Sequence, residues 1–89
     1  MAHMLVRHKI VDFNKWKSVY EEHRMAREAA GLKDLYLWRK EDDPNQVILL
    51  FEVLDIAKAK EFVNSTDAKE KRLAAGVEGP PDIMFLSEN

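Results

Sequence analysis

Nine residues decide the fold: Gln46-Val47-Ile48-Leu49-Leu50-Phe51-Glu52-Val53-Leu54. Side chains along a strand alternate between the two faces of its sheet, so this stretch predicts a strand with apolar residues on both sides. One face would carry Val47, Leu49, Phe51 and Val53. The other would carry Ile48, Leu50 and Leu54, with Glu52 as its polar member. We therefore expect a central strand in a sheet that is covered on both faces.

The residues before this stretch predict its first neighbour. Residues 32–40 include the run Leu-Tyr-Leu-Trp at 35–38, which is typical of strands. Glu41-Asp42-Asp43-Pro44-Asn45 favours a turn, because proline fixes one dihedral and Asp and Asn side chains bond to nearby backbone. Two strand-like runs around a short polar turn predict a β-hairpin.

The two ends of the chain predict the remaining strands. Residues 4–10 alternate, and one face would carry Met4, Val6, His8 and Ile10. Gly79-Pro80-Pro81 excludes a helix and begins an extended segment. In the strand expected at 82–86, Ile83 and Phe85 would oppose Met84 and Leu86.

A long helix is expected between the first two strands. Asp12 is a suitable N-cap, and neither proline nor glycine follows until Gly31, which suits a left-handed C-cap. That window allows a single helix of about five turns. At about 100° per residue, its inner stripe would be rich in aromatic residues: Phe13, Trp16, Val19, Tyr20, His23, Ala26, Arg27 and Ala30.

A second helix is expected after the cap residue Asp55, with a break at 64–67. Either Ser65 or Thr66 would cap the short helix that follows and ends at Gly76. The order strand, helix, strand, strand, broken helix, strand predicts an α+β, ferredoxin-like βαββαβ fold with helices on one face of an antiparallel sheet. We expect one domain over residues 4–89 and interpret residues 1–3 as a remnant of an expression vector, with Met4 as the natural start.

Helices on one face leave the other face of the sheet bare, yet that face is apolar. An exposed apolar patch of several hundred Å² is typical of an interface, and covering it would contribute several kcal/mol at about 25 cal/mol per Å². The simplest closure is a two-fold homodimer that packs sheet against sheet. The alternative is a small domain that uses both faces for its own packing.

Composition excludes several classes of protein. The 89 residues are 46% hydrophobic and 34% charged with a net charge of −2, so a nucleic-acid-binding face is not expected. Cysteine is absent, which removes disulfides and thiolate chemistry. No apolar run reaches the roughly 20 residues of a membrane helix, and the N-terminus lacks a signal-peptide pattern. We expect a cytoplasmic protein without a membrane partner.

Four segments resemble a known family: residues 8–17, 43–47, 51–55 and 75–81. They are similar to small proteins of the dimeric α/β-barrel superfamily, described as antibiotic-biosynthesis-monooxygenase-like or cyclase-like. The resemblance implies a homodimer with a pocket between the sheet and the helices of each subunit. Reported activities in the superfamily are cofactor-independent oxygenation of aromatic polyketides, polyketide cyclisation, haem degradation, dehalogenation and isomerisation. Because so many activities share this fold, the fold alone does not identify the reaction.

Candidate site residues lie on the inner stripe of the long helix and on the first strand. His23 and His8 are the candidate acid–base residues, because imidazole titrates near neutral pH. Tyr20, Trp16 and Trp38 would bind a flat ring, and Arg27 would hold an enolate or carboxylate. These residues also have structural interpretations. His23 would then be a hydrogen-bonded core residue, Trp16 part of the core, Trp38 a cap on the barrel, and Arg27 a side chain that reaches solvent.

Two functions remain open from the sequence. The first is a cofactor-independent monooxygenase or cyclase/isomerase that acts on a small aromatic or enolisable compound. The second is a non-catalytic ligand-binding or interaction module, which predicts a packed interior in place of a pocket above roughly 300 Å³. Haem chemistry, with His23 as axial ligand, is a third hypothesis, and no metal site is expected from the spacing of the histidines.

Two further sets of residues bear on these functions. The oxygenase members imply an Asn–Trp–Arg set, but Asn14 and Trp16 lie two apart on a helix and would point in different directions. Lys69, Lys71 and Arg72 form a basic spot that we interpret as a solvated face.

Overall fold

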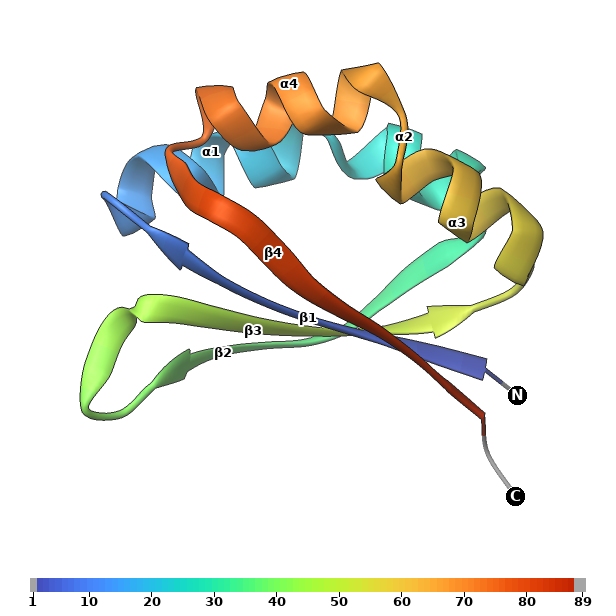
Figure 1. The fold of residues 1–89 in the computed structure, drawn as a ribbon, viewed down its shortest axis with the longest axis horizontal. Helices are drawn as coiled ribbons and strands as arrows, with labels where there is room; N and C mark the ends of the chain where they lie inside the picture. Colours follow the sequence, from blue (N-terminus) through green and yellow to red (C-terminus); the bar gives the residue numbers. More distant parts are fainter. Residues whose placement is uncertain (1, 88–89) are drawn as a thin grey trace.

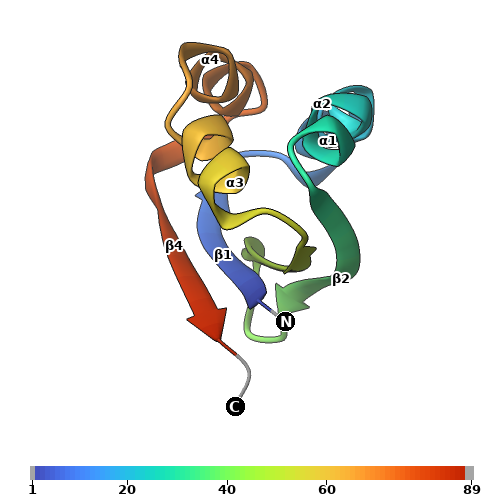
Figure 2. The ribbon, with the colours of Figure 1, turned by 90° about the vertical axis from the view of Figure 1, so that its right-hand side faces the viewer.

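The computed structural model describes residues 2–87. Four strands and four helices follow one another along the chain: β1 Ala2–Ile10, α1 Phe13–Glu22, α2 Arg24–Ala29, β2 Leu32–Lys40, β3 Asp43–Val53, α3 Ile56–Val63, α4 Thr66–Ala74 and β4 Val77–Ser87. All neighbouring strands are antiparallel, in the order β2-β3-β1-β4. Figures 1 and 2 show α1/α2 and α3/α4 as two pairs over the same face of the sheet. The ferredoxin-like βαββαβ prediction is confirmed.

The core lies between the sheet and these helices. Alternation in the strands determines which side chains enter it. Eight inward residues of β1 and β3 are less than a tenth exposed: Met4, Val6, His8, Ile10, Val47, Leu49, Phe51 and Val53. On β4, Ile83 and Phe85 pack against this core, as expected from the sequence.

The opposite face of the sheet is covered by no other part of residues 2–87 (Figure 1). One row of cross-strand partners runs from Tyr36 to Leu50, Leu5 and Met84, and Trp38 pairs with Ile48 in the next row. Tyr36 is 58% and Trp38 45% exposed, and their rings stack with centroids 4.9 Å apart. The apolar outer face predicted from the sequence is therefore present on this chain.

The prediction of a single long helix is wrong, because the helix breaks at His23. The φ and ψ angles there are −90° and 6°, so α1 ends at Glu22 and α2 begins at Arg24. The Tyr20 carbonyl, which in a continuous helix accepts from the backbone four residues later, accepts instead from the Arg27 guanidinium at 2.6 Å. A side chain that enters the hydrogen-bond ladder in this way kinks a helix.

Other boundaries differ from the sequence prediction by a few residues. The turn expected over 41–45 is shorter, because β3 already begins at Asp43. Strand β4 begins at Val77 and includes Pro80 and Pro81. Proline is tolerated there because β4 is an edge strand.

The remaining helix boundaries follow the predicted caps. Asp12 and Asp55 accept from backbone N–H groups of α1 and α3, and Ser65, not Thr66, caps α4. Within residues 2–87, no helix combines the length and apolar character needed to span a membrane.

Candidate functional site

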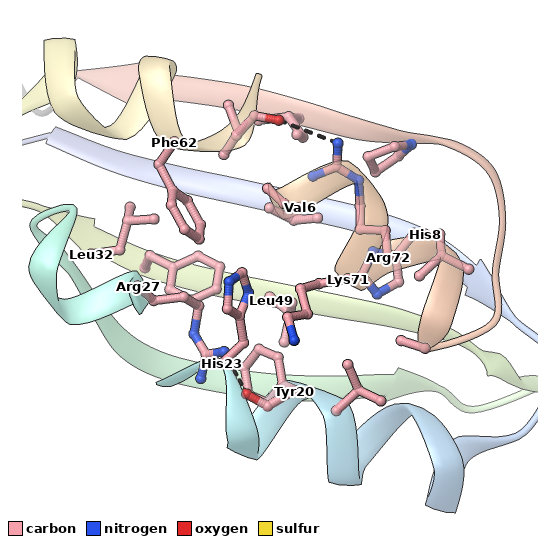
Figure 3. Close-up of a pocket in the computed structure, with 18 of the residues that line it drawn as sticks. Val6, His8, Tyr20, His23, Arg27, Leu32, Leu49, Phe62, Lys71 and Arg72 are labelled. Carbon is pink, nitrogen blue, oxygen red and sulfur yellow. Dashed lines mark hydrogen bonds between the residues drawn. The ribbon is translucent and has the colours of Figure 1, made fainter. Parts of the chain in front are cut away.

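A cavity of about 100 Å³ lies between the helices and the inner face of the sheet (Figure 3). Side chains from β1, β2, β3 and β4 line it below, and all four helices contribute from above. Its polar lining is confined to six residues: His8, Tyr20, His23, Arg27, Lys71 and Arg72. The rest is apolar and includes Trp16, Val6, Leu49, Phe51, Phe62 and Ile83. Five of the six predicted site residues thus converge on one cavity: His8, Trp16, Tyr20, His23 and Arg27.

Helix α1 builds one wall as a column of rings. Trp16 stacks on Tyr20 with centroids 4.8 Å apart and planes 17° apart, and Phe13 lies 5.8 Å from Trp16. These residues are three and four positions apart, which places them on one face of the helix. Burial raises the pKa of the Tyr20 phenol above its usual 10.0, so Tyr20 is a neutral hydroxyl on this wall. Because Trp16 stacks on the Tyr20 ring and the Arg27 guanidinium lies 3.7 Å from its centre, Tyr20 adds an apolar ring edge to this wall.

The geometry of Arg27 does not support the anion-binding role expected from the sequence. Arg27 is 5% exposed, and its guanidinium forms two hydrogen bonds to the Asp34 carboxylate, of 3.3 and 3.1 Å. It also lies 3.7 Å from the centre of the Tyr20 ring and bonds to the Tyr20 carbonyl. The carboxylate of Asp34 neutralises this charge within the fold. Arg27 therefore holds the wall together and does not reach solvent.

His8 is a buried polar residue of the cavity whose hydrogen-bonding capacity is unused. Its ring is 8% exposed and meets Trp16 edge to face, with centroids 5.6 Å apart. Among the described residues, neither Nδ1 nor Nε2 has a hydrogen-bond partner. Burial, with a smaller contribution from the charge of Arg72, lowers the pKa of His8 from 6.5 to about 4. At neutral pH the ring is uncharged and presents one donor and one acceptor.

His23 is engaged by its neighbours. Its Nε2 donates to the Asp67 carboxylate at 3.0 Å, and its ring lies 5.3 Å from that of Phe62. These contacts connect the α1/α2 break to α3 and α4. The hydrogen-bonded core interpretation of His23 therefore has direct geometric support, whereas its catalytic role stays a prediction.

Trp38 does not line the cavity, contrary to the expectation that it would join Tyr20 there. The register of β2 against β3 shifts between Asp34 and Tyr36. This bulge keeps Asp34 on the inner face, opposite Phe51, and turns Tyr36 and Trp38 to the outer face. A β-bulge re-aims side chains in this way.

Lys71 and Arg72, interpreted from the sequence as part of a solvated spot, both line the cavity, and Lys71 is also exposed as expected. Both lie on α4, and Arg72 donates to the Val63 carbonyl at 3.2 Å. Burial lowers the pKa of the Arg72 guanidinium, which is charged at neutral pH all the same. The position of Arg72 opposite His8 depends on how α4 packs over β1, so the local sequence carries no signal for it.

The haem hypothesis does not fit this cavity. Ligand pockets for ordinary small molecules measure roughly 300–1,000 Å³, and a porphyrin needs more room than the 100 Å³ present. The expected axial ligand, His23, is bonded to Asp67. Asn14 is exposed on α1 while Trp16 is buried, so the Asn–Trp–Arg set is not assembled either.

Solved structures show the same arrangement of elements. A provisionally named antibiotic biosynthesis monooxygenase from Bordetella bronchiseptica superposes with a TM-score of 0.77 at 15% identity, over 99% of this chain and 96% of that one. A variant of SnoaB, a cofactor-independent oxygenase from Streptomyces nogalater, gives 0.72 at 12% identity, over 98% and 91% of the two chains. The chain has the antibiotic-biosynthesis-monooxygenase-like fold.

Other structures with the antibiotic-biosynthesis-monooxygenase-like fold have different names. An uncharacterised NIPSNAP domain protein from Burkholderia xenovorans matches with a TM-score of 0.67 at 13% identity, over 100% of this chain and 95% of that one. No protein-family model and no curated protein sequence matches the chain. Because the sequence identities are this low, the likeness establishes the fold alone. The reaction has to be inferred from the geometry of the cavity.

Proposed function

We propose that this protein binds a small aromatic or enolisable compound beneath its helices and acts on it as a cofactor-independent monooxygenase or cyclase/isomerase. One observation carries the proposal: the buried His8 lines an apolar cavity, and neither of its ring nitrogens has a hydrogen-bond partner within residues 2–87. Buried polar groups are nearly always hydrogen-bonded, because leaving one unpaired costs about 1–3 kcal/mol. A ligand that bonds to His8 would remove that cost.

His8, and not His23, is the better candidate for acid–base chemistry in this proposal. The neutral ring would accept a proton from an enol or phenol held against Trp16 and Tyr20. The imidazolium so formed would be a buried positive charge near Arg72, and both its burial and the charge of Arg72 disfavour it. The enolate formed beside it supplies the compensating negative charge. The resulting electron-rich enolate is the common intermediate of carbon–carbon rearrangement and of reaction with O₂.

We further propose that the working unit is a cytoplasmic homodimer. The support is the bare outer face of the sheet, where Tyr36, Trp38, Met84 and Leu86 are each more than two-fifths exposed. A second copy packed by two-fold symmetry would cover the same residues on both chains. No residue of this face lines the cavity, so each subunit would carry its own site.

A pair of activity assays tests the proposed chemistry. Oxygen consumption would be followed with small phenols, and hydrogen–deuterium exchange at carbon would be followed with small cyclic ketones. Replacing His8→Leu should reduce turnover at least 100-fold, the usual contribution of general acid–base catalysis. Lys69→Gln, an exposed change outside the cavity, should leave turnover unchanged. Full activity of His8→Leu would contradict the proposal.

The second candidate function, a non-catalytic binding module, has one observation in its favour. The cavity of about 100 Å³ is smaller than the roughly 300 Å³ typical of ligand pockets. Such a module would either hold a small phenol or ketone without converting it or serve as an interaction surface. Binding that shifts the NMR signals of the Trp16 indole, with no turnover in either assay, would favour the module over the enzyme.

A further inference from the structure

The charges around the cavity divide into two kinds. Arg27 is neutralised by Asp34, and His23 donates to Asp67. Lys71 and Arg72 are different: within residues 2–87, neither forms an ion pair. No Asp or Glu of these residues lines the cavity. The cavity is therefore apolar, with two cations on its α4 side that have no ion-pair partner within residues 2–87.

Arg72 has N–H donors that form no hydrogen bond within the described residues. A guanidinium carries five N–H donors, and one hydrogen bond, to the Val63 carbonyl, is formed within the described residues. The side chain is only partly solvated, so its charge gains more from an anion than an exposed arginine would. Lys71 is exposed at the mouth of the same cavity and adds a second cation. His8 completes the polar side with a ring N–H (Figure 3).

We propose that the ligand of this cavity is a compact monoanion, a carboxylate or enolate oxygen on an apolar body, held by Arg72 with help from Lys71 and His8. This inference rests on the proposed function, since it names the class of compound that the same cavity takes. The apolar body would lie against Trp16 and Tyr20, while the anionic oxygen would face α4. A charge-assisted hydrogen bond to a guanidinium is about twice as strong as a neutral one, so charge would dominate the choice of ligand.

Two probes of equal shape test the inference. Benzoate and benzamide would be titrated into the full chain, and binding would be followed by NMR at the Trp16 indole and the backbone of α4. Benzoate should bind at least tenfold more tightly than benzamide. Arg72→Gln should reduce that ratio to near one, and Lys71→Gln should reduce it partly. Arg72→Lys, which keeps the charge, should retain a preference for benzoate.

Lys69→Gln is the matched control, because it removes a cation from the same helix outside the cavity lining. It should leave the ratio unchanged, which would separate a local effect of Arg72 from the general charge of α4. Equal affinity of benzoate and benzamide for the unmodified chain would overturn the anion inference and leave the proposed cavity function standing. A preference that persists in the Arg72→Gln/Lys71→Gln double variant would also overturn it. If neither probe shifts any signal of the cavity, the inference and the proposed function fail together.

Discussion

His8 combines deep burial with two ring nitrogens that have no hydrogen-bond partner within residues 2–87, and this makes its protonation expensive. Its pKa is lowered from 6.5 to about 4. The unfolded chain therefore binds more protons than the folded chain between these values, and the free energy of unfolding rises with pH across that window. Stability linked to His8 is fully present above pH 6.5 and is lost as the pH falls toward 4. Between pH 7 and pH 5 we expect a loss of about 2 kcal/mol from this residue.

Urea unfolding at pH 7 and pH 5 measures this loss. Carboxylates also titrate near pH 4, so the matched comparison is His8→Leu, which keeps the apolar packing and removes the imidazole. The variant should lose about 2 kcal/mol less than the original chain between the two pH values. Parallel pH profiles for the two proteins would show that His8 is protonated as easily in the folded state as in the unfolded one.

The Arg27–Asp34 pair is the buried ion pair of this cavity wall. Asp34→Asn would leave the guanidinium of Arg27, a residue only 5% exposed, without a counter-charge. Removing one partner of a fully buried pair costs about 3–5 kcal/mol, and because Asp34 keeps some access to water we expect about 2 kcal/mol in thermal or urea unfolding. Glu21→Gln, which breaks the exposed pair with Lys17, should have a far smaller effect. Equal effects of the two changes would contradict the structural role of Arg27.

At the scale of single residues, the sequence identified the members of the site better than their roles. The helical periodicity of residues 13–30 placed Trp16, Tyr20, His23 and Arg27 on the buried stripe, as the structure has them. It could not show that Arg27 meets Asp34, because that contact depends on the bulge in β2. Nor could it rank His8 above His23. The Asp67 partner of His23, and the absence of a partner for either His8 nitrogen in the described part of the chain, are properties of tertiary packing.

Individual elements depend on their caps, and α4 offers a clean test. The Ser65 hydroxyl accepts from the Ala68 N–H at 3.1 Å and donates to the Phe62 carbonyl at 2.6 Å, so it joins α3 to α4. Ser65→Ala should lower the free energy of unfolding by about 1–2 kcal/mol. Thr66→Ala is the matched control, because Thr66 is exposed and lies inside the helix. Its effect should be below about 0.5 kcal/mol. A larger loss from Thr66→Ala than from Ser65→Ala would show that Thr66, and not Ser65, caps α4.

The break at His23 shows where local pattern stops being informative for an element. Nothing in residues 13–30 ends a helix: this range has no glycine or proline, and the apolar stripe continues through the break. The cause lies in contacts with other parts of the chain. Arg27 reaches the Tyr20 carbonyl while bound to Asp34 of β2, and His23 is held by Asp67 of α4. A helix that is continuous by propensity is therefore divided by its tertiary neighbours.

For the whole molecule, strand alternation was sufficient to predict the layers. In β1, β3 and β4 the residues expected on the inner face are buried or packed against the core, and those expected on the outer face include the exposed Met84 and Leu86. Period-two patterns hold where strands pair without interruption, as β1 does with β3 from Ala2 to Lys9. The volume of the cavity was not predictable, because it depends on how four helices pack over these strands.

A charge at the centre of the outer face should separate the proposed dimer. Leu50 lies mid-sheet between Tyr36 and Leu5, and two-fold symmetry would bring both copies of Leu50→Glu into one interface. An unpaired buried carboxylate costs several kcal/mol, and each dimer would contain two. Light scattering after gel filtration at micromolar concentration should give twice the 10.4 kDa chain mass for the original protein and a single chain mass for the variant.

Leu73→Glu provides the comparison for this dimer test. Leu73 is 75% exposed on α4, on the helical side of the molecule, so a glutamate there meets solvent in both the single chain and the proposed dimer. That variant should keep the doubled mass. Circular dichroism would confirm that both variants remain folded. A doubled mass for Leu50→Glu, or a single-chain mass for the unmodified protein, would mean that the apolar outer face does not pair with itself.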